Sequence, residues 1–283
     1  MNLKFKEAAT LFQKGQIEKA EKICSEIKKN DPENVNNLNL LSIIFFQKKK
    51  FEDAIKIIKK SIKINPKQAE SHNNLGLMLM KLRKNNDAIS SYKKAIEIND
   101  RYTDAYNNIG IAYKELGVFN KAIFYWEKVI EIQPKNFQAY NNIGNIHLEE
   151  NKDNLAIQFY DKAISLNKNF YLAYFNRGNA FQKQGRLNES IDSFSEAIKL
   201  NSKYSEAYYN RGNSYRDINK LDFALSDYLS AFKLNPDLPN LLGNIFATKN
   251  NLCDWKNYEK NLSYLEKQIL NNKCIMSPFT SLS

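Results

Sequence analysis

The chain carries short stripes of apolar and small residues whose spacing alternates between three and four. One stripe consists of His72, Leu75, Gly76 and Leu79. A second consists of Ala88, Ile89, Tyr92, Ala95 and Ile96. This spacing places each set on one face of an α-helix, so the pattern predicts amphipathic helices over 72–79 and 88–96. Two helices of about 14 residues cannot bury these stripes alone, so the pair must stack on other pairs.

The helix pair recurs with a period of 34 residues. Six of the predicted second helices end in similar three-residue sequences, namely Ile64-Asn65-Pro66, Ile98-Asn99-Asp100, Ile132-Gln133-Pro134, Leu166-Asn167-Lys168, Leu200-Asn201-Ser202 and Leu234-Asn235-Pro236. Pro32 precedes Pro66 by the same interval. Seven units therefore cover residues 1–238, and residues 239–283 remain as a separate C-terminal segment.

Three further columns keep this register. Glycine fills the first, at Gly76, Gly110, Gly144, Gly178 and Gly212. A small residue fills the second, at Ala20, Ala54, Ala88, Ala122, Ala156, Ser190 and Ala224. A large aromatic fills the third, at Tyr92, Trp126, Tyr160, Phe194 and Tyr228. Together these columns resemble the tetratricopeptide repeat. The resemblance implies an all-α, right-handed superhelical solenoid of seven 34-residue helix pairs over 1–238, followed by capping or junction helices over 239–283.

Glycine and asparagine predict where the helices of a unit stop and start. We expect left-handed residues between the two helices at Gly15, Gly117, Asn151, Gly185 and Asn219. We expect N-caps shortly after them at Asn120, Asn154, Asn188 and Asp222. The first two units carry Ala8 and Ser42 in the glycine column and match the pattern less well, so they are expected to cap the solenoid.

The net charge of +11 arises mainly in residues 1–68, which hold 15 lysines against 8 acidic residues. These lysines are spread over predicted outer faces, and no basic groove interleaved with stacking aromatics is evident, so nucleic acid is not an expected partner. No apolar run has the length of a membrane span, and the N-terminus lacks the apolar stretch of a signal peptide. We therefore expect a cytoplasmic protein.

Residues capable of catalysis or metal binding are few. The two histidines, His72 and His147, fall on core stripes, and Cys24 replaces a core aromatic, so all three are expected to be buried and inert. The cysteines are three in number and show no C-x-x-C spacing, and no phosphate-binding glycine loop occurs. We therefore predict no catalytic residue, no metal and no cofactor in this chain.

Asparagine recurs on the predicted first helices, away from their core stripe. At about 100° per residue, Asn74 lies about 200° from His72. Its column and the neighbouring columns give the predicted peptide-binding residues Asn74, Asn108, Asn142, Asn176, Asn210, Asn107, Asn141, Asn145, Asn179 and Asn213, with Asn73 beside them. Stacked amides both donate and accept, which suits the backbone of an extended peptide in a concave groove. The alternative is that these amides bond adjacent helices to one another. Tetratricopeptide domains that bind the acidic C-termini of heat-shock chaperones need a lysine one residue before the asparagine column of their first repeat. That column contains Phe5 and Asn39 here and no lysine, so binding of such termini is not expected.

The C-terminal segment adds a second resemblance. Leu242-Gly243-Asn244, Leu252-Cys253-Asp254-Trp255 and Ser277-Pro278-Phe279 resemble the junction between repeats and catalytic region in bacterial SPINDLY-type protein O-GlcNAc transferases. The two nucleotide-binding lobes of that family are absent, so the chain alone is predicted to be inactive.

Two main interpretations therefore stay open. The chain is either a module that binds a protein or an extended peptide, or the acceptor-recognition part of a split or truncated O-GlcNAc transferase. In the second case, a glycosyltransferase catalytic domain is a partner of the C-terminal segment. A third interpretation, an assembly scaffold for pili or secretion, has no discriminating residue.

Overall fold

The computed structural model describes residues 3–252, which form fifteen α-helices and no β-strand. The A helices, which open each repeat, are α1 (Leu3–Gln13), α3 (Val35–Gln47), α5 (Ala69–Lys81), α7 (Thr103–Glu115), α9 (Phe137–Glu149), α11 (Tyr171–Lys183), α13 (Ser205–Asp217) and α15 (Leu241–Asn251). The B helices are α2 (Ile17–Asn30), α4 (Phe51–Ile64), α6 (Asn85–Ile98), α8 (Phe119–Ile132), α10 (Asp153–Leu166), α12 (Leu187–Leu200) and α14 (Leu221–Leu234). The all-α prediction is confirmed.

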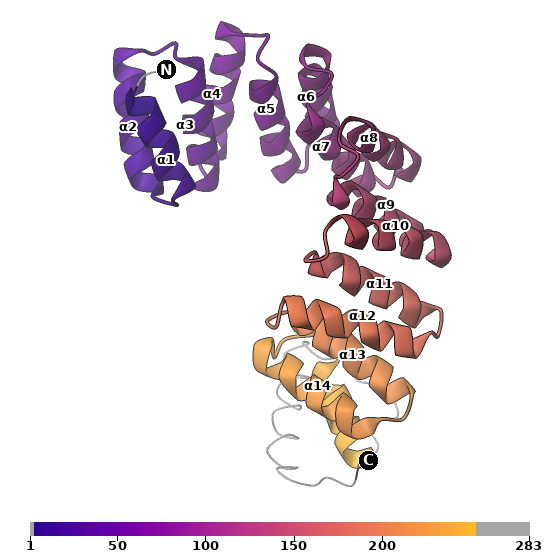
Figure 1. Cartoon of the computed structure of the whole chain (residues 1–283). Coiled ribbons are helices and arrows are strands. Elements are labelled where there is room, and N and C mark those ends of the chain that lie inside the picture. Colours follow the sequence, from indigo (N-terminus) through magenta and orange to yellow (C-terminus); the bar gives the residue numbers. More distant parts are fainter. Residues whose placement is uncertain (1–2, 253–283) are drawn as a thin grey trace. The chain divides into compact units, whose positions relative to one another are not determined.

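The helices belong to two compact units. The first unit is Met1–Pro134 with α1 to α8, and the second begins at Lys135 and contains α9 to α15. Within each unit, every A helix contacts the B helix that follows it, and that B helix contacts the next A helix (Figure 1). Stacked helix pairs, which the apolar stripes predicted, are therefore present in both units. The predicted division of the chain at residue 238 rests on repeat content and stays a prediction.

The glycine and aromatic columns meet in the core of each unit. A Cβ atom placed on Gly144 would lie 2.7 Å from Cε1 of Tyr160, and one on Gly212 would lie 2.7 Å from Cε1 of Tyr228. Both tyrosines are completely buried. The glycine column therefore exists because the ring of the B helix occupies the space that a side chain on the A helix would need.

The predicted left-handed positions are confirmed by φ values of +70° at Gly117, 61° at Asn151 and 59° at Asn219. Lys49 and Arg83 fill the same column in the second and third repeats with φ values of 60° and 59°. Sequence patterns did not identify these two, because neither residue type favours that conformation.

The N-cap prediction was wrong by two residues. Asn120 and Asn154 each follow the first residue of their helix, as do Asn188 and Asp222. The cap positions are Val118, Lys152, Arg186 and Lys220, none of which makes a side-chain capping bond. The reason is the tight turn after the left-handed residue. The carbonyl of Val118 already accepts from the amide of Ala122, so the helix starts before a polar cap is reached.

The histidines and Cys24 lie in the core, as predicted. His72 is 7% exposed, and its Nε2 lies 2.9 Å from the carbonyl oxygen of Pro66. His147 is 9% exposed, and Cys24 is fully buried. Burial raises the pKa of the Cys24 thiol to about 12, so the thiol stays protonated at neutral pH. In the described part of the chain, no helix has the length and apolar character needed to cross a membrane.

Candidate functional site

In each unit the predicted asparagines recur on successive A helices, and we call this set of side chains the amide row. One column of this row runs through Asn74, Asn108, Asn142, Asn176 and Asn210 and continues at the same spacing to Asn244 on α15. Asn107, Asn145, Asn179 and Asn213 lie beside it and, like the column itself, are partly exposed. Asn73 and Asn141 are only 5% exposed. The prediction that these two lie on the surface was wrong, because neighbouring helices cover them.

Amides of neighbouring repeats bond to each other along this row. Asn108 donates through Nδ2 to Oδ1 of Asn73 at 3.0 Å. Asn176 repeats this geometry, donating to Oδ1 of Asn141 at 3.0 Å. Each bond links one A helix to the A helix of the preceding repeat. The interpretation that the amides join adjacent helices therefore holds for these pairs.

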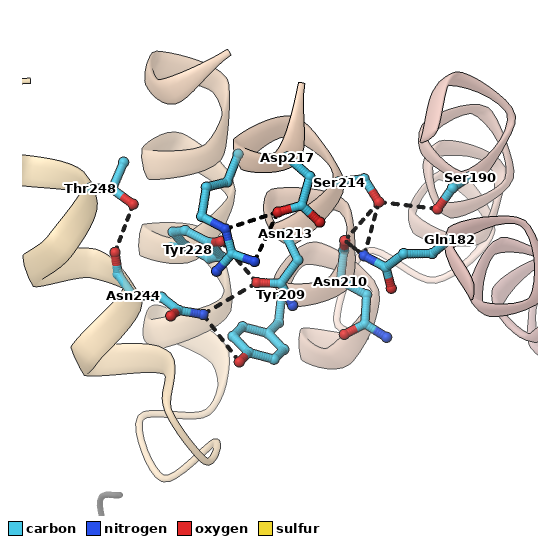
Figure 2. A network of polar contacts seen from close by, with 11 residues as sticks. Gln182, Ser190, Tyr209, Asn210, Asn213, Ser214, Asp217, Tyr228, Asn244 and Thr248 are labelled. Atoms are coloured by element: carbon cyan, nitrogen blue, oxygen red, sulfur yellow. Dashed lines mark hydrogen bonds and ion pairs between the residues drawn. The ribbon is translucent and has the colours of Figure 1, made fainter. Parts of the chain in front are cut away.

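Aromatic residues replace the acceptor in the last two repeats, and the donor then finds another partner. Phe175 stands where Asn141 stands one repeat earlier, and Asn210 donates instead to Oδ1 of Asn179 at 2.8 Å. Tyr209 follows in the same column. Figure 2 shows Asn244 reaching from α15 to both the hydroxyl of Tyr209 and Oδ1 of Asn213, each at 3.2 Å.

Buried aromatics of the B helices hold several acceptor amides in place. Nε1 of Trp126 donates to Oδ1 of Asn107 at 3.1 Å. The hydroxyls of Tyr160 and Tyr228 donate to Oδ1 of Asn145 and Asn213 at 2.9 and 2.8 Å. Burial raises the pKa of both tyrosines, so these hydroxyls remain donors at neutral pH. The aromatic column therefore packs the core and also fixes the amide row.

Two amides of this column, Asn74 and Asn142, make no side-chain hydrogen bond to another described residue. By analogy with Asn108 and Asn73, Asn74 should donate to Asn39. Oδ1 of Asn39 instead accepts from the hydroxyls of Ser61 and Ser71, at 2.8 and 2.9 Å. Among the described residues, Asn74 then makes no side-chain hydrogen bond, and Nδ2 of Asn39 is buried without a partner.

A pocket of about 690 Å³ lies beside Asn74 in the first unit. Phe5 of α1 and Leu40 and Ile43 of α3 supply apolar walls, while Asn39 and Asn74 supply amides. Sequence analysis placed Phe5 and Asn39 in a column but did not identify this pocket. The sequence feature that could have indicated the pocket is Leu40, an aliphatic residue in the column where later repeats carry asparagine.

The second unit has a different polar feature, an ion pair whose carboxylate is buried. Arg211 stands in a column where Leu75, Ile109 and Ile143 are aliphatic. Its guanidinium donates twice to the carboxylate of Asp227, both times at 2.7 Å, and Asp227 is 5% exposed. Within residues 3–252, no group of three or more histidine, cysteine, aspartate or glutamate side chains is arranged to hold a metal ion.

Comparison with protein-family models identifies the repeat. A model described as TPR repeat matches residues 76–117 and 144–185. Two models described as tetratricopeptide repeat match residues 103–136, 171–204 and 205–238, and residues 125–158. A model of anaphase-promoting complex, cyclosome, subunit 3 matches residues 13–95. Comparison with curated proteins finds no match.

Solved structures show the same architecture. A chain of the APC/C hetero-tetramer Cut9-Hcn1 superposes with a TM-score of 0.68 at 16% identity, covering 85% of this chain and 48% of that one. MamA superposes with a TM-score of 0.52 at 28% identity, covering 59% and 96%. YrrB, described as a TPR protein with an unusual peptide-binding site, gives 0.50 at 24% identity, covering 64% and 93%. This chain therefore spans about half the length of the APC/C chain. Each of the three superpositions covers only part of this chain.

The C-terminal resemblance gains no support from these matches. Every family model that matches ends at or before residue 238. Most of the residues that suggested the transferase junction, from Cys253 onward, lie outside the described residues.

Proposed function

We propose that this chain, which belongs to the tetratricopeptide-repeat proteins, binds extended segments of a partner protein along the amides that each unit presents. The proposal draws on the repeat family and on the one amide per repeat that stays partly exposed. Such spacing suits an extended backbone, which presents alternating N–H and C=O groups.

The observation that carries the proposal is unused hydrogen-bonding capacity. Asn108, Asn176 and Asn210 each donate one N–H to a neighbouring repeat. Their Oδ1 atoms accept no hydrogen bond from the described residues. These oxygens are therefore available for the N–H groups of a bound peptide, while the internal bonds hold the amides in one orientation.

Peptide display tests the proposal. Random peptides displayed on phage are selected on the immobilised full-length chain, and the dissociation constant of each enriched peptide is measured by fluorescence anisotropy. The combined replacement of Asn108, Asn176 and Asn210 by alanine should weaken binding about tenfold or more, since each hydrogen bond contributes about 0.5–1.5 kcal/mol.

A matched control removes three asparagines from elsewhere on the protein. Asn86, Asn120 and Asn188 are exposed and lie at the second position of B helices. Their combined replacement by alanine should leave peptide affinity unchanged. Enriched peptides that bind the two triple variants equally well would refute the amide row as the binding site. The failure of any peptide to enrich would count against the function itself.

The transferase interpretation stays a second hypothesis that no observation on the described residues favours. The DNA downstream of the Ser283 codon tests this hypothesis. An adjacent or frame-shifted reading frame that encodes two α/β lobes would support it.

A further inference from the structure

We infer that the pocket of the first unit anchors the bound segment by one aliphatic or aromatic side chain, whose backbone amide pairs with Asn74. This inference rests on the proposed function and specifies where binding begins and which residue the partner must supply. Three observations support it, and each concerns a different property of the pocket.

The first observation is the missing inter-repeat bond. Asn108, Asn176, Asn210 and Asn244 each donate to the preceding repeat, whereas Asn74 and Asn142 make no such bond among the described residues. Asn74 is partly exposed and lines the pocket with both its donors and its acceptor unused among the described residues. An amide in this state offers an N–H to a peptide carbonyl and an oxygen to a peptide N–H, which is the pairing that one backbone residue provides.

The second observation is the unpaired nitrogen of Asn39. This side chain is 6% exposed, lines the same pocket, and its Nδ2 has no hydrogen-bond partner. Native proteins leave few buried donors unpaired, and each such group calls for an explanation. A backbone carbonyl that enters the pocket supplies the acceptor that this N–H group lacks.

The third observation is the apolar lining next to these amides. Phe5, Leu40 and Ile43 come from two A helices, and Ile98, which is 37% exposed, adds a further apolar surface. A volume of about 690 Å³ is within the usual range of ligand pockets. In the second unit, asparagines Asn145, Asn179 and Asn213 fill the column of Ile43, so the apolar character belongs to the first unit.

The test uses the peptides enriched by display on the full-length chain. They should share one aliphatic or aromatic residue, and exchanging that residue for serine should weaken binding at least tenfold. Replacing the amide bond that carries this residue's N–H by an ester should also weaken binding, because the peptide then offers no N–H group to Oδ1 of Asn74.

Matched variants of the protein locate the anchor. Asn74→Ala and Ile43→Ser should each lower affinity about tenfold, whereas Asn188→Ala and Ile111→Ser, which lie outside the pocket, should change it less than about threefold. Ile43→Met keeps the apolar volume and should keep the affinity, which separates loss of the anchor from loss of the fold.

The outcomes distinguish this inference from the proposed function. Peptides that bind tightly but respond to Asn176→Ala and not to Asn74→Ala or Ile43→Ser would overturn the anchor and leave the amide row intact. Enriched peptides without any common apolar residue would do the same. If no peptide is enriched, both the anchor and the proposed function fail.

Discussion

Replacing Gly212 by alanine should destabilise the second unit. The new Cβ would lie 2.7 and 2.8 Å from two ring atoms of Tyr228 and 3.3 Å from the carbonyl oxygen of Ala224. The ring has nowhere to move, because Tyr228 is completely buried and its hydroxyl donates to Asn213 at 2.8 Å.

The expected change in the free energy of unfolding combines three contributions, of which two destabilise the unit and one stabilises it. Overpacking of a core costs roughly 1–3 kcal/mol. Displacement of the ring would also weaken the bond to Asn213, which contributes about 0.5–1.5 kcal/mol. Alanine recovers at most about 1 kcal/mol through its higher helix propensity. We therefore expect the free energy of unfolding to fall by roughly 1–3 kcal/mol.

Urea denaturation followed by far-ultraviolet circular dichroism measures this change. Gly243 is the matched control, because it lies in α15 of the same unit and an added Cβ would contact nothing within 4 Å. Gly243→Ala should be neutral or slightly stabilising. If Gly212→Ala proved as stable as the unmodified protein, the steric origin of the glycine column would be wrong. Partial recovery by Tyr228→Leu in the same chain would confirm it.

Three further predictions concern backbone strain, pH and the Arg211–Asp227 ion pair. Arg83→Gly should raise the free energy of unfolding by about 1 kcal/mol in urea denaturation, because Arg83 has a φ of 59°; a loss of stability would refute the assignment of strain. Burial raises the pKa of Cys24 from 9.0 to about 12 and that of Tyr204 from 10.0 to about 12. The unfolded chain therefore loses these protons first, and the urea midpoint should fall as the pH rises above about 9; a flat profile up to about pH 11 would contradict this. Asp227→Ala should cost roughly 2–4 kcal/mol by thermal and urea denaturation, because it leaves the guanidinium of Arg211 without its carboxylate partner. The double variant with Arg211→Ile should recover most of that loss, and no recovery would show that the ion pair is not the cause.

The fold could be predicted from the sequence because its main contacts lie within one repeat. The meeting of Gly212 and Tyr228, for example, depends on two residues 16 positions apart, and five repeats contain the same pair. Helix starts were less predictable. The N-cap at Val118 is set by the geometry of the preceding turn, which a preference for asparagine at caps does not report.

The candidate site was predicted only in part, because its hydrogen bonds depend on contacts between repeats. Helical geometry correctly placed Asn74 and Asn108 away from the main core stripe. It could not tell that Asn73 would be covered by the next repeat, or that two serines would occupy Oδ1 of Asn39. Each of these outcomes depends on residues more than 20 positions away, and no periodicity within one helix contains that information.

The hydrogen bonds of the amide row have a consequence for how such a protein evolves. The donor stays asparagine from Asn74 to Asn244, whereas the acceptor column changes from Asn141 to Phe175 and Tyr209. The bond survives these changes because Asn179 and Asn213 offer a second acceptor one helical turn further on. In the last repeats a mutation of the first acceptor is therefore buffered, since Asn210 and Asn244 keep a partner where Phe175 and Tyr209 replace asparagine. The chain keeps its repeats connected while their exposed surfaces remain free to acquire new specificity.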